Sequence, residues 1–143
     1  MRVWLLTILL LMPTVAATSI AESDYTMPLK LKTGVKPLNV VPEMLLANQV
    51  VCSFFDHHQH DCIITSMHDG VHGPRSLHSR DGLCRAIDYR TKHLNDVTKQ
   101  FIVQGIKEAL GDQYDVILES LGQSNEHLHV ELSNLLVKPT VDV

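Results

Sequence analysis

The amino-acid sequence predicts an α+β domain with a small, mostly antiparallel sheet and helices packed on one of its faces. Two segments carry apolar residues at three- and four-residue spacing, which is typical of amphipathic helices. Short runs of apolar and β-branched residues, separated by turn residues, indicate strands. The expected order is helix, strand, long loop, strand, helix and two further strands.

The first helix is expected to run from Pro42 to about Asp56. Proline is tolerated in the first turn of a helix, and the acidic Glu43 complements the positive end of the helix dipole. Apolar side chains recur on one stripe that should face the core: Leu46, Val50, Val51, Phe54 and Phe55. The polar cluster at residues 57–61 marks the end of this helix.

The second helix is expected to run from Asn95, as its N-cap, to about Leu110. Asparagine is a favoured N-cap because its side chain accepts a hydrogen bond from a backbone N–H in the first turn. The expected inner face contains Val97, Phe101, Ile102, Ile106, Ala109 and Leu110. Gly111 suits the left-handed position that commonly ends a helix.

Strands are expected at residues 62–65, 83–89, 114–119 and 127–132. Between the first two strands, residues 66–82 are rich in Gly, Pro, Ser, His and Asp, and this composition predicts a long loop. Loops of this length without secondary structure of their own are commonly functional. We therefore expect this loop to contribute residues to a site.

The N-terminus has the layout of a secretory signal peptide. Arg2 supplies a positive charge, about a dozen mostly apolar residues follow, and small residues precede a cleavage site expected after Ala21, with Ala16 or Ala17 as the alternative. The apolar run is shorter than the roughly 20 residues that span a bilayer, so we expect cleavage rather than an uncleaved membrane anchor. The expected organisation is a signal peptide at 1–21, an extended segment at 22–41 and a folded domain at 42–143. The mature chain would then be periplasmic or extracellular, without a stable membrane span.

Composition limits the classes of partner. A chain of 143 residues has room for one ordinary domain. The net charge of −4 and the lack of a basic stripe argue against nucleic acid as a partner. The sequence does not determine the oligomeric state, and a monomer is the expectation. Cys52, Cys62 and Cys84 are an odd number of thiols, so one pair can bridge in an oxidising compartment, and all three pairings remain open.

Histidine and aspartate residues predict a metal site. His127 and His129 are two apart on an expected strand, so their side chains point to the same face. An earlier segment supplies His78 and Asp88. Zinc prefers imidazole and carboxylate ligands, and a catalytic zinc site usually has three protein ligands and one exchangeable water. The pattern therefore favours zinc-assisted hydrolysis.

Three motifs in order resemble the zinc D-Ala-D-Ala carboxypeptidase family. They are Arg75-Ser76-Leu77-His78, then Ala86-Ile87-Asp88-Tyr89-Arg90-Thr91, then Glu126-His127-Leu128-His129. The segment from Ile64 to His72 also resembles the phage-encoded branch of this family. The family includes D-Ala-D-Ala dipeptidases and phage L-alanyl-D-glutamate endolysins, and it shares its fold with the Hedgehog signalling domain. The likeness covers roughly residues 28–133.

The resemblance implies a set of metal ligands. His78, Asp88 and His129 match the three residues that hold zinc in the family. The segment between the first two ligands is longer here than the family usually has, so residues 79–85 must contain an insertion. Surface loops tolerate insertions at low cost. His72 is the alternative first ligand if the insertion displaces His78.

The resemblance also implies catalytic and substrate-binding residues. Glu126 matches the general base that takes a proton from zinc-bound water, and His127 would stabilise the tetrahedral intermediate. Strict alternation along a strand would turn Glu126 away from His127, so Glu119, at the end of the preceding strand, is the competing base. Arg75 and Ser76 match positions near which the family holds the substrate carboxylate.

The implied activity is that of a zinc metallopeptidase acting on peptidoglycan stem peptides. Residues 42–143 would form its zinc peptidase-like domain, and the bond cut would be D-Ala–D-Ala or L-Ala–D-Glu. An alternative is a non-catalytic zinc-binding module of the same fold with a structural or partner-binding role. A third reading is a secreted protein that scavenges metal with its additional histidines.

Overall fold

The structure, a computed structural model, describes residues 30–133 as two helices and a five-stranded sheet. The helices are α1 (Pro42–His57) and α2 (Asp96–Leu110). The strands are β1 (Lys30–Leu31), β2 (Ile63–Ser66), β3 (Ala86–Arg90), β4 (Tyr114–Glu119) and β5 (His127–Leu132). Two 3₁₀ turns, η1 (Arg80–Gly82) and η2 (Gly111–Gln113), precede β3 and β4. These elements confirm the α+β class.

The sheet is mixed, which corrects the expectation of a mostly antiparallel one. Its strand order is β1-β2-β3-β5-β4. The edge strand β1 runs parallel to β2, whereas the other neighbouring pairs are antiparallel. A parallel pair needs a long crossover connection, and the residues between β1 and β2, which include α1, supply it.

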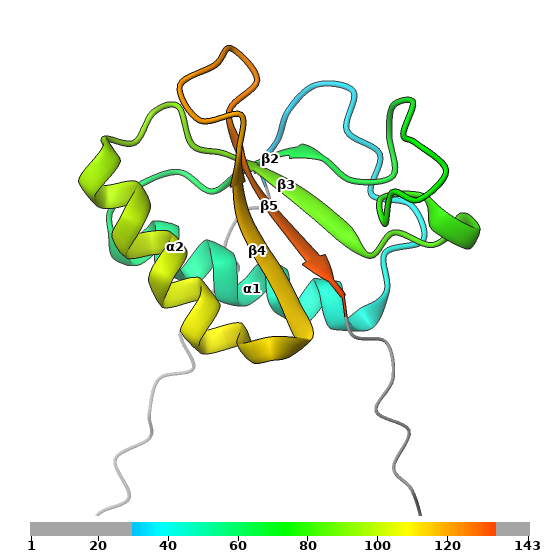
Figure 1. Cartoon of the computed structure of the whole chain (residues 1–143), viewed down its shortest axis with the longest axis horizontal. Coiled ribbons are helices and arrows are strands. Elements are labelled where there is room, and N and C mark those ends of the chain that lie inside the picture. Colours follow the sequence, from blue (N-terminus) through cyan, green and yellow to red (C-terminus); the bar gives the residue numbers. More distant parts are fainter. Residues whose placement is uncertain (1–29, 134–143) are drawn as a thin grey trace, which may run out of the picture.

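Both helices pack against one face of the sheet and lie side by side (Figure 1). Alternate residues of the strands enter this core, with Ile87 and Tyr89 from β3 and Leu128 and Val130 from β5. Burying a large apolar side chain contributes about 1.5–3 kcal/mol. A shift of register by one residue would expose all of these side chains, so the core determines which face of β3 and β5 stays polar.

The helices begin and end close to the expected residues, but their buried faces differ from the expected ones. The Asn95 side chain accepts a hydrogen bond from a backbone N–H of the first turn, which confirms this N-cap. Leu46 and Phe101, expected in the core, are 63% and 66% exposed. Where the two helices meet, a Cβ on Gly105 would lie 2.4 Å from the ring of Phe54, so the glycine allows α1 and α2 to approach closely.

Part of the segment expected to lead into the domain belongs to the sheet. Lys30–Leu31 form β1, and Val40 makes an isolated bridge with Cys84 just before β3. The expected signal peptide at 1–21 lies outside the described residues. Within residues 30–133, no helix combines the length and the apolar character that crossing a membrane requires.

One disulfide resolves the cysteine pairing that the sequence leaves open. Cys52 of α1 is bonded to Cys62, which directly precedes β2, so the bridge ties the helix to the sheet. Cys84 is a free and fully buried thiol whose S–H donates to the carbonyl of Ala86. Burial raises the pKa of the Cys84 thiol to about 11, so this cysteine is not a nucleophile at neutral pH.

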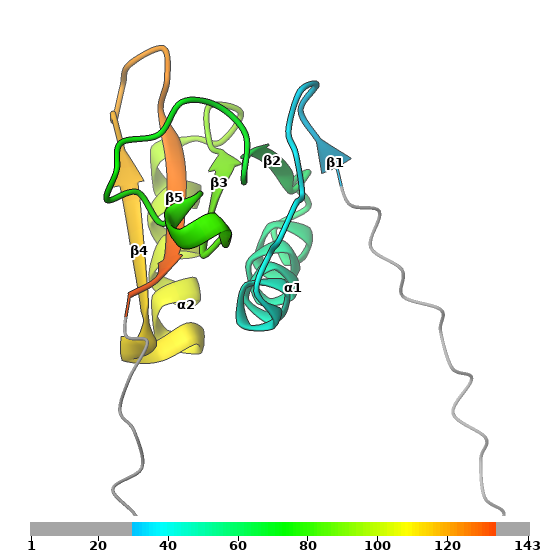
Figure 2. The ribbon, with the colours of Figure 1, turned by 90° about the vertical axis from the view of Figure 1, so that its right-hand side faces the viewer.

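The expected long loop connects β2 to β3, and Figure 2 shows it in green in front of β5. The Asp69 carboxylate accepts hydrogen bonds from the backbone N–H groups of Lys36 and Met67, which fixes the first part of the loop. Further along, the ring of His78 lies 5.3 Å from the ring of His129 on β5. The loop therefore crosses the polar face of the sheet and delivers a histidine to it.

Candidate metal centre

The register of β3, β4 and β5 gathers polar residues on the face opposite the helices. Asp88 lies directly opposite His129, and Arg90 lies opposite His127. On the other side of β5, His127 lies opposite Glu119. Residues two apart on a strand point to the same face. The side chains of Asp88, His127, His129 and Glu119 therefore share one surface.

Three side chains on this surface form a group that could hold a metal ion: His78, Asp88 and His129. Oδ1 of Asp88 lies 3.3 Å from Nε2 of His78 and 2.8 Å from Nδ1 of His129. One donor atom from each residue lies within 4.8 Å of the others. Zinc bonds of about 2.0–2.1 Å place neighbouring ligands of a tetrahedral site about 3.3 Å apart. The three residues expected from the sequence thus stand at a separation that suits a zinc ion.

Both histidines are oriented by a second partner, as metal-binding histidines usually are. Nδ1 of His78 lies 2.7 Å from the carbonyl oxygen of Met67, and an N–H donated there leaves Nε2 free on the side of Asp88. Nε2 of His129 lies 3.0 Å from Oε2 of Glu131, which leaves its Nδ1 free on the side of Asp88. Two such imidazoles and one carboxylate fit the ligand preference of zinc.

The electrostatics of this group favour a positive charge. Burial raises the pKa of Asp88, but the hydrogen bonds with His129 and His78 outweigh it and hold the pKa below its ordinary value. Burial lowers the pKa of His129, whereas the hydrogen bonds to Asp88 and Glu131 raise it to about 9. A metal ion would compete with the proton that His129 holds between these two carboxylates.

The segment between His78 and Asp88, in which the resemblance implies an insertion, contains the tight turn η1. Asp81 and Gly82 both have positive φ angles there, 56° and 73°, so the chain reverses within few residues. The turn leaves His78 buried over the sheet beside Asp88. His72, the alternative ligand, stacks against His78 with ring centroids 4.4 Å apart. It belongs to neither donor group found in residues 30–133.

Glu119, His127 and His129 form a second group with suitable donors. Nε2 of His127 lies 3.3 Å from Oε2 of Glu119 and 3.6 Å from Oδ1 of Asp88, and its Nδ1 lies 2.7 Å from the carbonyl oxygen of Asn125. The side chain of Glu119 is 46% exposed, against 13% for Asp88. The more exposed carboxylate of Glu119 suits proton exchange with solvent, and the more buried carboxylate of Asp88 suits permanent ligation of a metal ion.

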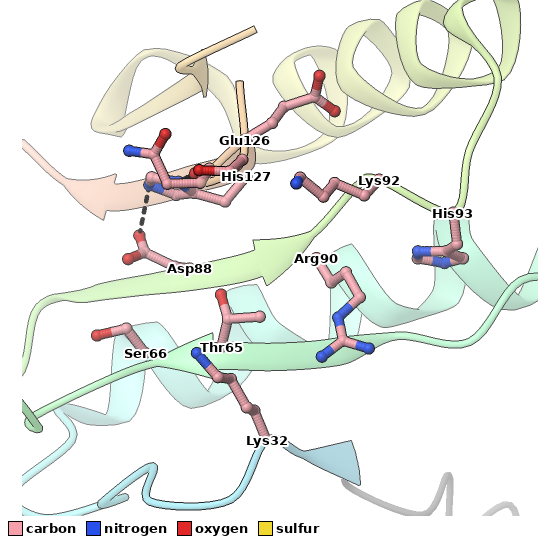
Figure 3. A pocket seen from close by; sticks show the side chains of 11 residues that line it. Lys32, Thr65, Ser66, Asp88, Arg90, Lys92, His93, Glu126 and His127 are labelled. Carbon is pink, nitrogen blue, oxygen red and sulfur yellow. Dashed lines mark hydrogen bonds and ion pairs between the residues drawn. The ribbon is translucent and has the colours of Figure 1, made fainter. Parts of the chain in front are cut away.

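Glu126, expected as the general base, does not face the donor cluster, which corrects that assignment. Its buried carboxylate forms an ion pair of 2.8 Å with Lys99 and accepts hydrogen bonds from the Thr91 hydroxyl and the Gly122 N–H. The hydrogen bond from Lys99, followed by that from Gly122, lowers the pKa of Glu126 to about 2. Figure 3 shows this carboxylate turned away from the ring of His127. Consecutive residues at the start of a strand point in opposite directions.

Two clefts flank the donor cluster. One, of about 570 Å³, is lined in part by Asp88 and His127. The other, of about 430 Å³, is lined in part by Arg75 and Glu131. The ring of His129 contacts both Asp88 and Glu131, so it lies between the two clefts. An extended substrate could therefore occupy one cleft on each side of the cluster.

The two residues expected to hold a substrate carboxylate have different surroundings. Arg75 is exposed in the smaller cleft and makes no ion pair with any residue of the described part of the chain. The Ser76 hydroxyl instead accepts a hydrogen bond of 3.3 Å from the backbone N–H of His78. Ser76 thus shapes the loop that carries a donor, whereas Arg75 remains available to a ligand.

Two residues at the site are missing from the sequence analysis. Glu131 is the third polar residue of the pattern His127-x-His129-x-Glu131, so strand alternation alone could have placed it beside His129. Lys99, the partner of Glu126, lies on α2, and no local pattern links the two residues. Only the packing of α2 against the sheet brings that lysine to the start of β5.

Comparison of the chain with protein-family models, with curated proteins and with solved structures found no match.

Proposed function

We propose that this chain is a zinc-dependent peptidase that hydrolyses the stem peptides of bacterial peptidoglycan. The observation that carries the proposal is the convergence of donor atoms from His78, Asp88 and His129 between two clefts. The three motifs that contain these residues resemble the zinc D-Ala-D-Ala carboxypeptidase family, and that resemblance supplies the substrate class. The buried, oriented donors support a resident ion rather than casual binding of metal to surface histidines.

His78, Asp88 and His129 would hold the zinc ion. When bound, zinc would lower the pKa of a water from about 15.7 toward about 7 and polarise the scissile carbonyl. Nδ1 of His78 and Nε2 of His129 would keep donating to Met67 and Glu131. These hydrogen bonds would prevent the rings from rotating and would strengthen them as ligands.

Glu119 would be the general base in place of Glu126. Its carboxylate is half-exposed, lies 3.3 Å from His127 and belongs to the donor group that shares His129. Oε2 of Glu119 would accept the proton that the attacking water loses and pass it to the leaving amine. The oxygens of Glu126 already accept from Lys99, the Thr91 hydroxyl and the Gly122 N–H, so that residue is poorly suited to this exchange.

His127 would stabilise the negative charge that develops on the carbonyl oxygen. Its Nδ1 is directed at the Asn125 carbonyl, which fixes the plane of the ring and points Nε2 into the space between Glu119 and Asp88. Because Nδ1 donates to Asn125, Nε2 carries an N–H only in the imidazolium form of the ring, and that form would donate to the oxygen of the substrate as charge develops. Arg75, in the other cleft, would bind a carboxylate of the substrate.

Zinc content and digestion of peptidoglycan, measured on the same preparations, test the proposal. The wild-type protein should bind one zinc ion per chain and release peptide fragments that mass spectrometry can identify. His129→Ala should lose both properties, whereas His57→Ala, a matched change at an exposed helix end, should keep both. One tightly bound zinc ion with no cleavage of any peptidoglycan bond would contradict the peptidase and favour a non-catalytic zinc module.

A further inference from the structure

We propose that Lys32, Arg90 and Lys92 make the cleft beside Asp88 and His127 a carboxylate-binding subsite for an acidic peptide. The inference rests on the proposed peptidase function, because the acidic segment would continue from the bond that is cut. It adds a second anion-binding position, on the opposite side of His129 from Arg75.

Charge is the first argument. The whole chain has a net charge of −4, yet three cationic side chains line this one cleft. None of the three forms an ion pair with another described residue, although Lys30 and Lys99, close to them in the sequence, both do. Lysine and arginine side chains brought together without counter-charges repel one another. An anionic ligand would relieve that repulsion.

The negative groups of the cleft are already balanced. Asp88 would be neutralised by the metal, and Glu126 is paired with Lys99. The remaining lining consists of uncharged polar residues and two histidines, namely Thr65, Ser66, Ser124, Asn125, His93 and His127. The free charge of the cleft is therefore positive, and its hydroxyl and amide groups can bind the peptide backbone.

The backbone places the three cations on neighbouring segments around one cleft. Arg90 follows Asp88 by two residues on β3, so both side chains point to the same face, and Lys92 comes just after the strand. Lys32 is held next to β2 by a hydrogen bond from its N–H to the carbonyl of Ile64. Figure 3 shows Lys32 beside Thr65 of β2, Arg90 extending from β3 toward β2, and Lys92 on the His127 side of β3.

This arrangement sets the spacing of the ligand. Residues two apart on a strand are separated by about 7 Å, which is also the length of about two residues of an extended peptide. A peptide whose scissile carbonyl lies at Asp88 would thus present a carboxylate to Arg90 about two residues away. Arginine can bind a carboxylate with two parallel hydrogen bonds, and the lysines would add charge on either side.

Binding of a labelled peptide, measured by fluorescence anisotropy, tests the subsite. The probe is L-Ala–γ-D-Glu–L-Lys–D-Ala–D-Ala, compared with the same peptide in which both free carboxylates are amides. The zinc-loaded protein carries Glu119→Gln to stop turnover, and mass spectrometry verifies that the peptide stays intact. Arg90→Gln should weaken binding about tenfold, and Arg90→Gln with Lys92→Gln about fiftyfold.

Lys107→Gln is the matched control, since it removes the same charge from an exposed position of α2 outside the cleft. It should leave both the affinity and the zinc content unchanged, and the amidated peptide should bind weakly to every variant. Equal affinity of the two peptides, or wild-type affinity of the double variant, would overturn the subsite. Binding could depend on Arg90 and on the carboxylates while the parent protein cleaves no peptide. That outcome would support the subsite and contradict only the proposed peptidase activity.

Discussion

Two glutamates at the ends of the β4–β5 turn have opposite environments. The side chain of Glu126 is 4% exposed and forms an ion pair with Lys99, which together with backbone hydrogen bonding lowers its pKa to about 2. The side chain of Glu119 is 46% exposed, lies against His127 and shares a donor group with it. Glu126 is buried and paired, whereas Glu119 is half-exposed and lies beside the histidines of the second donor group.

This difference shows that a place in a motif does not make a carboxylate a base. A general base must reach the reacting water and must exchange its proton near the working pH. Glu126 fails on both counts, because Lys99 and Gly122 occupy its oxygens and favour its ionised form. We infer that its role is structural; three of the four predictions below test this contrast with Glu119, and the other tests the orientation of His129.

The largest effect should come from Glu119→Gln. Removing the proposed base should lower kcat about 10²- to 10⁴-fold while leaving the zinc content unchanged, because the metal donors are intact. Steady-state hydrolysis of peptidoglycan fragments and elemental analysis measure the two quantities. Glu126→Gln should keep kcat within a few-fold in the folded fraction, and Glu108→Gln on α2 is a neutral control. A large loss of kcat in Glu126→Gln alone would reverse the two roles.

The next largest effect should be the loss of stability in Lys99→Met. This change leaves the buried carboxylate of Glu126 without its cation and should cost about 3–5 kcal/mol in the free energy of unfolding. Urea denaturation measures it. Asp96→Asn removes only the exposed partner of Lys99 and should cost about 1 kcal/mol or less. Equal losses in the two variants would show that the Lys99–Glu126 pair is not the stabilising one.

A smaller effect is expected from Glu131→Gln. The amide would orient His129 less firmly than the carboxylate that now lies 3.0 Å from its Nε2. Zinc affinity, measured by competition with a chelator, should fall about 10- to 100-fold. Asp115→Asn is the control, because Asp115 lies opposite Glu131 on β4 and is exposed. An unchanged affinity in Glu131→Gln would show that His129 needs no orienting carboxylate.

The smallest effect should appear in acid. The folded-state pKa of Glu126, about 2, lies below its ordinary value of 4.5, so its contribution to stability is complete above about pH 4.5. That contribution should disappear as the pH falls toward 2, because the folded state must then bind a proton. Between these pH values, the free energy of unfolding of the metal-free protein should fall more steeply with decreasing pH for wild type than for Glu126→Gln. Parallel pH dependences would contradict the low pKa.

The sequence predicted most of the elements because their signals are local. The limits of β4 and β5 agree with the expected residues, since turn residues bound both runs. The edge strand β1 has two residues and no pattern of its own, so it could not be recognised before its partner β2 was placed. The exposure of Phe101 likewise departs from the apolar pattern of its own segment.

The residues of the candidate site also differ in whether a local sequence signal could reveal them. His78, Asp88 and His129 belong to motifs, and the structure brings their donor atoms together. The burial of Glu126 could not be predicted from its own segment, because its partner Lys99 belongs to a helix on the far side of the sheet. The one local signal was the alternation of side chains along β5, which predicts that Glu126 points away from His127, and this prediction agrees with the structure.

The buried thiol of Cys84 has a practical consequence. With no exposed surface and a raised pKa, it cannot react with an alkylating reagent while the domain is intact, and the other two cysteines are consumed by their bridge. The rate at which Cys84 becomes labelled therefore reports opening of the domain at the start of β3, the strand that carries Asp88. A bound ion or peptide that stabilises the folded domain will slow the labelling of Cys84, whether or not any bond is hydrolysed.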